Sequence, residues 1–266
     1  MKYLAQSVGE STIFKVEEGA GIFFQDATET VTFAAYYPYQ NEDAGSLPGT
    51  VTVNTKDNNG TNTQKNIDFL FATGATASKS SSTVQFADNT SKDSKFGGVD
   101  SRFKHQMAQL KLIVQASTSD GFIVEEAKAV CDEESKYVLT SGLIHEGTFT
   151  ISVSEEGEAT GIAEAGKTTS NSDWDITKCV YQNSDDQMSR TYTLILLPQE
   201  SSSFYFKATI GGQVYISEDF NPTLSAGKTC SYTIIVKKTG LDIEGCKIAE
   251  WEKSSIAEED IYVEIQ

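Results

Sequence analysis

The sequence predicts an all-β protein with two sandwich cores, and three observations support this fold class. Apolar and polar residues alternate along most of the chain, with the two-residue period of half-buried strands. Stretches rich in Gly, Asn, Asp and Ser separate these segments and supply turn conformations. A length of 266 residues exceeds one typical domain, so we expect two cores of unequal size.

Six segments show this alternation most clearly. In chain order, the apolar face of each consists of Val31, Phe33, Ala35 and Tyr37; Leu110, Leu112 and Val114; Phe149, Ile151 and Val153; Tyr192, Leu194 and Leu196; Phe204, Phe206, Ala208 and Ile210; and Tyr232, Ile234 and Val236. No segment of ten or more residues has a convincing 3.6-residue period, so helices should be short or absent. One helical turn is expected within Gly245–Trp251.

A change in composition predicts where the two domains meet. Between residues 74 and 94, polar residues dilute the apolar pattern. We therefore expect an N-terminal sandwich over residues 1–80, a Ser-rich connection over 81–96 and a C-terminal sandwich over 97–266. A second polar tract, 155–173, has too little apolar content to pack well, so it is expected to form a loop of the later domain.

Charge and cysteine content limit the function classes. The formal net charge of -17 is spread along the chain, which argues against nucleic acid as a partner. No apolar run is long enough to span a membrane, and the first residues lack the apolar core of a signal peptide. The protein is therefore expected to be cytosolic or to have lost a targeting segment. Buried thiols are favoured over bridges, but the disulfide state stays open for Cys131, Cys179, Cys230 and Cys246.

Several fragments imitate catalytic or phosphate-binding motifs but lack their required context. Ser225–Lys228 fits S-x-x-K and Lys238–Gly240 fits K-T-G, yet no S-D-N lies between them and no long helix is expected to carry the serine. Gly227–Thr229 resembles the end of a phosphate-binding loop whose first glycine is missing. The sequence therefore assigns no catalytic, cofactor-binding or metal-binding residue, and we expect a protein that is not an enzyme and has no cofactor.

The two histidines are interpreted as structural. Neither His105 nor His145 stands beside a nucleophile signature such as G-x-S-x-G. We expect His105 to be a half-buried residue near the start of the second sandwich, and His145 to be exposed in a turn.

The run Tyr36–Tyr39 raises one possibility of ligand binding. Clustered tyrosines at a strand edge can stack on sugars or anchor a protein interface, so Tyr37 and Tyr39 are candidate ligand contacts. The alternative is that two of these tyrosines alternate into the core while the others cover a loop.

The strands also carry a family resemblance. Val31–Tyr39, Asp68–Ala72 and Phe103–Leu110 resemble, in this order, motifs of the fimbrillin-like (Mfa-like) family of Bacteroidales fimbrial subunits. The C-terminal part agrees, with Ala226–Val236, Lys238–Leu241, Ile248 and Trp251. The resemblance implies two tandem transthyretin-like or immunoglobulin-like β-sandwiches, with a first domain that is shortened in this chain.

The same resemblance implies a function and a location. It implies a non-enzymatic pilin or tip subunit at the cell surface, exported as a lipoprotein. It also implies assembly with other fimbrial subunits outside the outer membrane by strand exchange, and a role in adhesion. The alternative function is a surface adhesin that binds glycan or host protein through loops and Tyr-rich edges.

The C-terminal tail is the candidate for an exchanged strand. Ile261, Val263 and Ile265 alternate with polar residues beyond an acidic spacer, a pattern suited to adding a strand to an exposed sheet edge. The alternative is that the tail completes its own domain.

Overall fold

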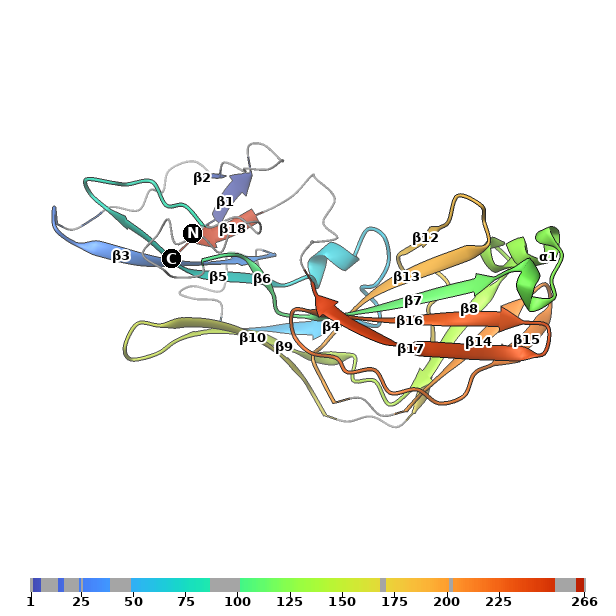
Figure 1. The fold of residues 1–266 in the computed structure, drawn as a ribbon. Coiled ribbons are helices and arrows are strands. Elements are labelled where there is room, and N and C mark those ends of the chain that lie inside the picture. The colour runs from blue at the N-terminus through green and yellow to red at the C-terminus, as the bar shows by residue number, and fades with distance from the viewer. Residues whose placement is uncertain are drawn as a thin grey trace.

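The computed structural model describes residues 2–5, 14–16, 24, 26–38, 49–86, 101–167, 171–200, 203–251 and 262–265. They form a protein that is almost entirely β, with two sandwiches lying end to end (Figure 1). The predicted all-β fold class is confirmed.

The first sandwich combines a six-stranded and a three-stranded sheet. The larger sheet has the order β2-β1-β18-β3-β5-β6, and its strands are β1 (Lys2–Ala5), β2 (Phe14–Val16), β3 (Thr30–Tyr37), β5 (Leu70–Ser78), β6 (Lys104–His105) and β18 (Tyr262–Ile265). The smaller sheet has the order β10-β9-β4, with β4 (Thr50–Asn54), β9 (Glu146–Val153) and β10 (Ala159–Ala165). All neighbouring strands in these two sheets are antiparallel.

The second sandwich combines a five-stranded and a four-stranded sheet. The five-stranded sheet has the order β12-β13-β7-β16-β17, with β7 (Ala108–Ala116), β12 (Tyr181–Asn183), β13 (Ser189–Leu196), β16 (Lys228–Lys237) and β17 (Gly240–Glu250). The other has the order β11-β8-β14-β15, with β8 (Lys136–Ser141), β11 (Ser172–Asp175), β14 (Phe204–Ile210) and β15 (Gln213–Ile216). Strands β7 and β16 run parallel, whereas the other neighbours are antiparallel.

Helices are short, as the sequence predicts. The structure has one α-helix, α1 (Val124–Lys128), and 3-10 helices at Gln64–Asn66, Thr118–Asp120 and Ala129–Cys131 within the described ranges. Among those residues, no helix is both long and apolar enough to cross a membrane. The helical turn expected in Gly245–Trp251 is wrong, because this segment up to Glu250 belongs to β17, where a bulge opposite Tyr232 interrupts the regular register.

The core of the second sandwich follows the alternation in the sequence. Leu110, Leu112 and Val114 of β7 have no exposed surface, and they pack against the inner faces of the facing sheet. The phenol of Tyr137, on β8, is also fully buried and donates a hydrogen bond of 2.6 Å to the carbonyl oxygen of Val130. A buried hydroxyl with a partner avoids the cost of an unsatisfied polar group.

The core of the first sandwich joins residues that are distant in the sequence. Phe69, before β5, stacks on Phe149 of β9 with ring centroids 4.4 Å apart. Strand β9 pairs with β4 through five residue pairs, including Val51 with Phe149. Strands β9, β10 and β18 belong to sheets of the first sandwich, although all three lie beyond residue 97. The observed strand pairing therefore departs from the expected boundaries at residues 80 and 97.

The polar tract 155–173 contains strand β10 and the first two residues of β11, so the loop expected there is wrong over about half of its length. Strand β10 pairs with β9 along its whole length, and β11 pairs with β8. The inner face of β10 carries only small residues, Ala159, Gly161 and Ala163. Small side chains give a weak apolar signal even where the strand covers a core.

A polar and aromatic cluster lies where the two sandwiches meet. His105, at 7% exposure, is joined through Nδ1 to a carboxylate oxygen of Asp68 at 2.6 Å. Its ring stacks on Trp251 at 3.7 Å, nearly parallel. Strand β6 pairs with β5, and the chain then enters β7 of the second sandwich. His105 is therefore buried and not half-buried as expected, and its strand β6 belongs to a sheet of the first sandwich and not to the second.

His145 is half-buried, so its expected exposure in a turn is wrong. Its Nδ1 lies 3.0 Å from the hydroxyl of Thr55, and its ring lies edge-on to Trp174. Burial, aided by the positive charge of Lys56, lowers the pKa of His145 from 6.5 to about 4, although Asp57 acts in the opposite direction. The folded protein therefore holds this imidazole neutral at mildly acidic pH.

We expect the stability contributed by His145 to fall as the pH drops from about 6.5 to about 4. In this window the unfolded chain binds a proton at His145 and the folded chain does not, so acid favours unfolding. Relative to His145→Gln, the free energy of unfolding of the wild type should fall by about 2–3 kcal/mol across the window. Urea unfolding of both proteins at several pH values measures this difference, and parallel curves would contradict the prediction.

Candidate functional site

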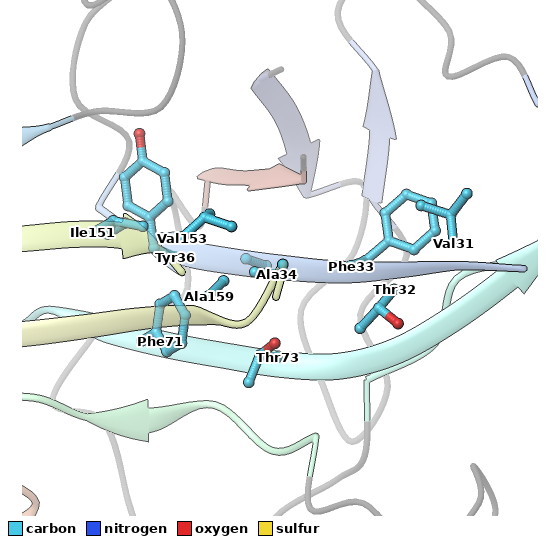
Figure 2. Close-up of a pocket in the computed structure, with 12 residues that line it drawn as sticks. Val31, Thr32, Phe33, Ala34, Tyr36, Phe71, Thr73, Ile151, Val153 and Ala159 are labelled. Carbon is cyan, nitrogen blue, oxygen red and sulfur yellow. The ribbon is translucent and has the colours of Figure 1, made fainter. Parts of the chain in front are cut away.

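An apolar groove opens between the two sheets of the first sandwich. Its volume is about 240 Å³. One wall is formed by β3 and β5, and the other by the β9–β10 hairpin (Figure 2). The lining residues are Val31, Thr32, Phe33, Ala34, Ala35, Tyr36, Phe71, Thr73, Ile151, Val153, Gly157 and Ala159. The groove presents mainly apolar side chains, and none of the described residues that line it is charged.

The width of the groove depends on small residues of β10. A Cβ atom at Gly161 would lie 2.6 Å from the ring of Phe71, which is too close for a side chain without movement of that ring. Glycine at this position therefore lets β10 approach β5. Val153, at the end of β9, is 44% exposed although it points to the same face as buried Ile151, so the core opens toward solvent here.

A strand position for the C-terminal tail lies in the same sheet as β3. Strand β18 lies between β1 and β3, with Tyr3 opposite Val263 and Ala35 opposite Ile265 (Figure 1). Only two residue pairs join β18 to β3, and three join it to β1. This position, called here the β18 slot, is therefore filled by a short segment from the far end of the chain.

Two of the three candidate assembly residues lie in a described strand. Val263 and Ile265 lie in β18, whereas Ile261 lies outside the described residues. The tail pairs with strands of its own chain in this structure. The tail therefore completes a sheet of its own chain, but that sheet belongs to the first sandwich and not to the C-terminal sandwich to which the sequence assigned the tail.

Of the two candidate ligand contacts, Tyr37 is buried and Tyr39 lies outside the described residues. Tyr37 is 2% exposed, and Tyr36 is 3% exposed. Both faces of β3 are covered at this end, so alternation does not leave either ring outside. The prediction of a ligand contact through Tyr37 is therefore not met by its position.

The fragments that imitate catalytic motifs take structural positions. Ser225 is exposed in the turn before β16, and the Lys228 ammonium forms an ion pair with Glu250 across the ladder. Lys238, in the turn between β16 and β17, pairs with Glu126 of α1 at 2.8 Å. Within the described ranges, no group of three or more His, Cys, Asp or Glu side chains could hold a metal ion.

Several residues that shape the groove and the slot could not be identified from the sequence. Phe71, Gly157 and Ala159 line the groove, and β1 forms one side of the slot. Phe71 belongs to the motif Asp68–Ala72, but its contact with β10 depends on the pairing of distant segments. In the sequence, β10 is indicated only by the alternation of Ala159, Gly161 and Ala163 with other residues.

Comparison with known proteins identifies a matching family and solved structures of similar fold. The model of the fimbrillin-like family matches residues 1–251. Among curated proteins, no significant match is found. A solved candidate cell adhesion protein from Bacteroides ovatus has a similar fold, with a TM-score of 0.60, 23% identity, and coverage of 90% of this chain and 75% of that one.

A second solved structure supports the same fold. It is a candidate cell adhesion protein from Bacteroides uniformis, with a TM-score of 0.58, 19% identity, and coverage of 94% of this chain and 84% of that one. The family match covers the strands of both sandwiches except β18, and it includes the groove and the junction at Trp251. The chain belongs to the fimbrillin-like family and is a non-enzymatic protein of the fimbrial subunit class.

Proposed function

We propose that this chain is a structural subunit of a surface fimbrium that polymerises by β-strand exchange. In this proposal the tail of one subunit leaves its own β18 slot and enters the slot of the next subunit. Adhesion, lipid anchoring and an outer-membrane location belong to the same proposal, because the family resemblance implies them.

The β18 slot is the observation that carries the proposal. Its occupant is held by only two residue pairs to β3 and three to β1, so few ladder contacts must break for the strand to leave, although its departure also separates β1 and β2 from β3. Identical subunits offer identical slots, and the same ladder bonds can form between chains as within one chain. Repetition of a head-to-tail contact then builds a filament.

The apolar groove gives the exchanged strand a second source of binding energy. Ala35 and Tyr36, which lie opposite Ile265 and Glu264 in the ladder, also line the groove. A strand that enters the slot therefore docks beside exposed apolar surface such as Val153. Backbone hydrogen bonds and apolar burial both favour its retention.

Deletion of residues 258–266 should abolish filament growth. We expect the full chain to form filaments on incubation at high concentration, and the deletion variant to stay monomeric because it has no strand to donate. Light scattering and electron microscopy measure the difference. Circular dichroism serves as the control that the remaining β-structure is intact.

A peptide with the sequence of residues 258–266 provides the matched control. It should bind the deletion variant, whose slot is empty, far more tightly than it binds the full chain. Filaments from the deletion variant equal to those of the full chain would contradict the proposal. Failure of the peptide to bind a folded deletion variant would contradict it as well.

A further inference from the structure

Two cysteines lie on one face of neighbouring strands near the end of the second sandwich. Cys230 of β16 stands opposite Ile248 of β17. Because side chains alternate along a strand, Cys246 shares the face of Ile248, two residues away. The β-bulge places both Gly245 and Cys246 opposite Tyr232. Cys230 and Cys246 are therefore diagonal neighbours on the same face of the ladder.

The two thiols are close enough to interact. Each lies within hydrogen-bonding reach of the other, and the hydroxyl of Tyr232 approaches both. Their accessibility differs: Cys230 is 1% exposed, whereas Cys246 is exposed on the edge strand. The arrangement combines one thiol that an external reagent can reach with one that is shielded behind it.

The other two cysteines have different surroundings. The Cys131 thiol donates to the carbonyl oxygen of Ser189 at 3.2 Å. The Cys179 thiol is buried, and its burial raises its pKa to about 12. These two thiols serve as internal references for the reactivity of the pair.

We propose that Cys230 and Cys246 are a site of disulfide formation, oxidised by exchange with an external disulfide. The Cys246 thiolate attacks a sulfur of the oxidant, which forms a mixed disulfide and releases one oxidant thiol. Cys230 then loses its proton and attacks the sulfur of Cys246, which expels the second oxidant thiol. Two protein thiols are oxidised to one disulfide, and one external disulfide is reduced to two thiols.

The electrostatics of the pair set the order of these steps and the stability of the product. Burial, together with the neighbouring Cys246 thiol, raises the pKa of Cys230 to about 12. Cys230 is therefore protonated near neutral pH and is the weaker first nucleophile. A thiol with a high pKa is also a poor leaving group, so the completed disulfide should resist reduction.

The bond would fasten an edge strand at the point where the chain leaves the sandwich. Strand β17 is the last strand of its sheet and leads into Trp251, after which the tail begins. If the tail is held by a neighbour, as in the proposed function, tension would peel β17 from β16 starting at Glu250. A disulfide at Cys246 would stop this peeling. The mechanical role rests on the proposed function, whereas formation of the bond does not.

Thiol counting on the monomeric full chain tests the proposal. After incubation with oxidised glutathione, denaturation and alkylation, the number of free thiols should fall from four to two, and peptide mapping should find Cys230 linked to Cys246. Retention of all four thiols would overturn the proposal. A stable glutathione adduct at Cys246 of the wild type, or a link between chains, would overturn it too.

Matched variants assign the reaction to the pair. Cys246→Ser should retain all three of its thiols, whereas Cys230→Ser should accumulate a glutathione adduct at Cys246 because the second attack is missing. Cys131→Ser should form the link as the wild type does. Oxidation should raise the Tm of the wild type by about 5 °C and leave that of Cys246→Ser unchanged. Because the measurement uses monomers, its outcome is independent of filament formation.

Discussion

Replacement of Phe149 by alanine is expected to lower the free energy of unfolding by about 3–5 kcal/mol. The ring is 1% exposed, stacks on Phe69 and also contacts Tyr36. It lies on β9, the central strand of the three-stranded sheet, so its removal leaves a cavity between the two sheets of the first sandwich. Denaturant titration followed by tryptophan fluorescence and circular dichroism measures the loss.

A neighbouring substitution controls for changes in the strand itself. Thr150 lies on the opposite face of β9, where its hydroxyl bonds that of Thr50 at 3.1 Å. We expect Thr150→Ala to cost less than about 1 kcal/mol, because an exposed hydrogen bond contributes little. Equal costs for Phe149→Ala and Thr150→Ala would contradict the burial that the structure assigns to Phe149.

A double-mutant cycle asks whether residues 69 and 149 share one core. The sequence assigned them to different domains, whereas the structure stacks their rings at 4.4 Å. The two alanine substitutions should therefore be non-additive, with a coupling energy of about 0.5–1.5 kcal/mol. Strict additivity would favour the boundaries expected from the sequence.

The sequence predicts the second sandwich well because its inner faces carry large apolar residues. Strands β7, β13, β14 and β16 contain the alternating Leu, Ile, Tyr and Phe residues that identify them. Each of these strands needs only a two-residue period to be recognised. The absence of long helical periods likewise predicts the short helices that the structure contains.

The organisation of the first sandwich could not be read in the same way. Its smaller sheet combines β4 with β9 and β10, which follow almost a hundred residues later. Composition detects a polar connection but carries no information about which distant strands pair. Strand β10 was missed for a further reason, because Ala159, Gly161 and Ala163 are small enough to look like loop residues.

The candidate site shows where alternation fails as a guide to exposure. The rule places Tyr36 and Tyr37 on opposite faces of β3, which suggests that one of them reaches solvent. Both are buried, and Tyr36 belongs to the core between the two sheets. The tail was a better case, since its short alternating pattern correctly indicated a strand at Tyr262–Ile265.

Mixing two variants, each with one cysteine introduced into the ladder between β3 and β18, should reveal transfer of the tail from one subunit to the next. One chain carries Ala35→Cys, and the other carries Ile265→Cys with a tag that changes its size. These positions face each other in the ladder between β3 and β18, where opposed Cβ atoms lie within disulfide reach. Both chains also carry Cys246→Ser, which removes the exposed native thiol.

The cross-link between these two chains is the most direct measurement of strand exchange. After mixing under conditions of filament growth and mild oxidation, a non-reducing gel should show a mixed dimer of the two sizes. Each labelled chain mixed with the Cys246→Ser parent should give no such band. A control chain carries both Ala35→Cys and Ile265→Cys. A disulfide within this chain shows that the geometry of the ladder permits the bond. If that link forms while the mixed dimer stays absent from filaments, the tail remains in its own subunit and the exchange mechanism is wrong.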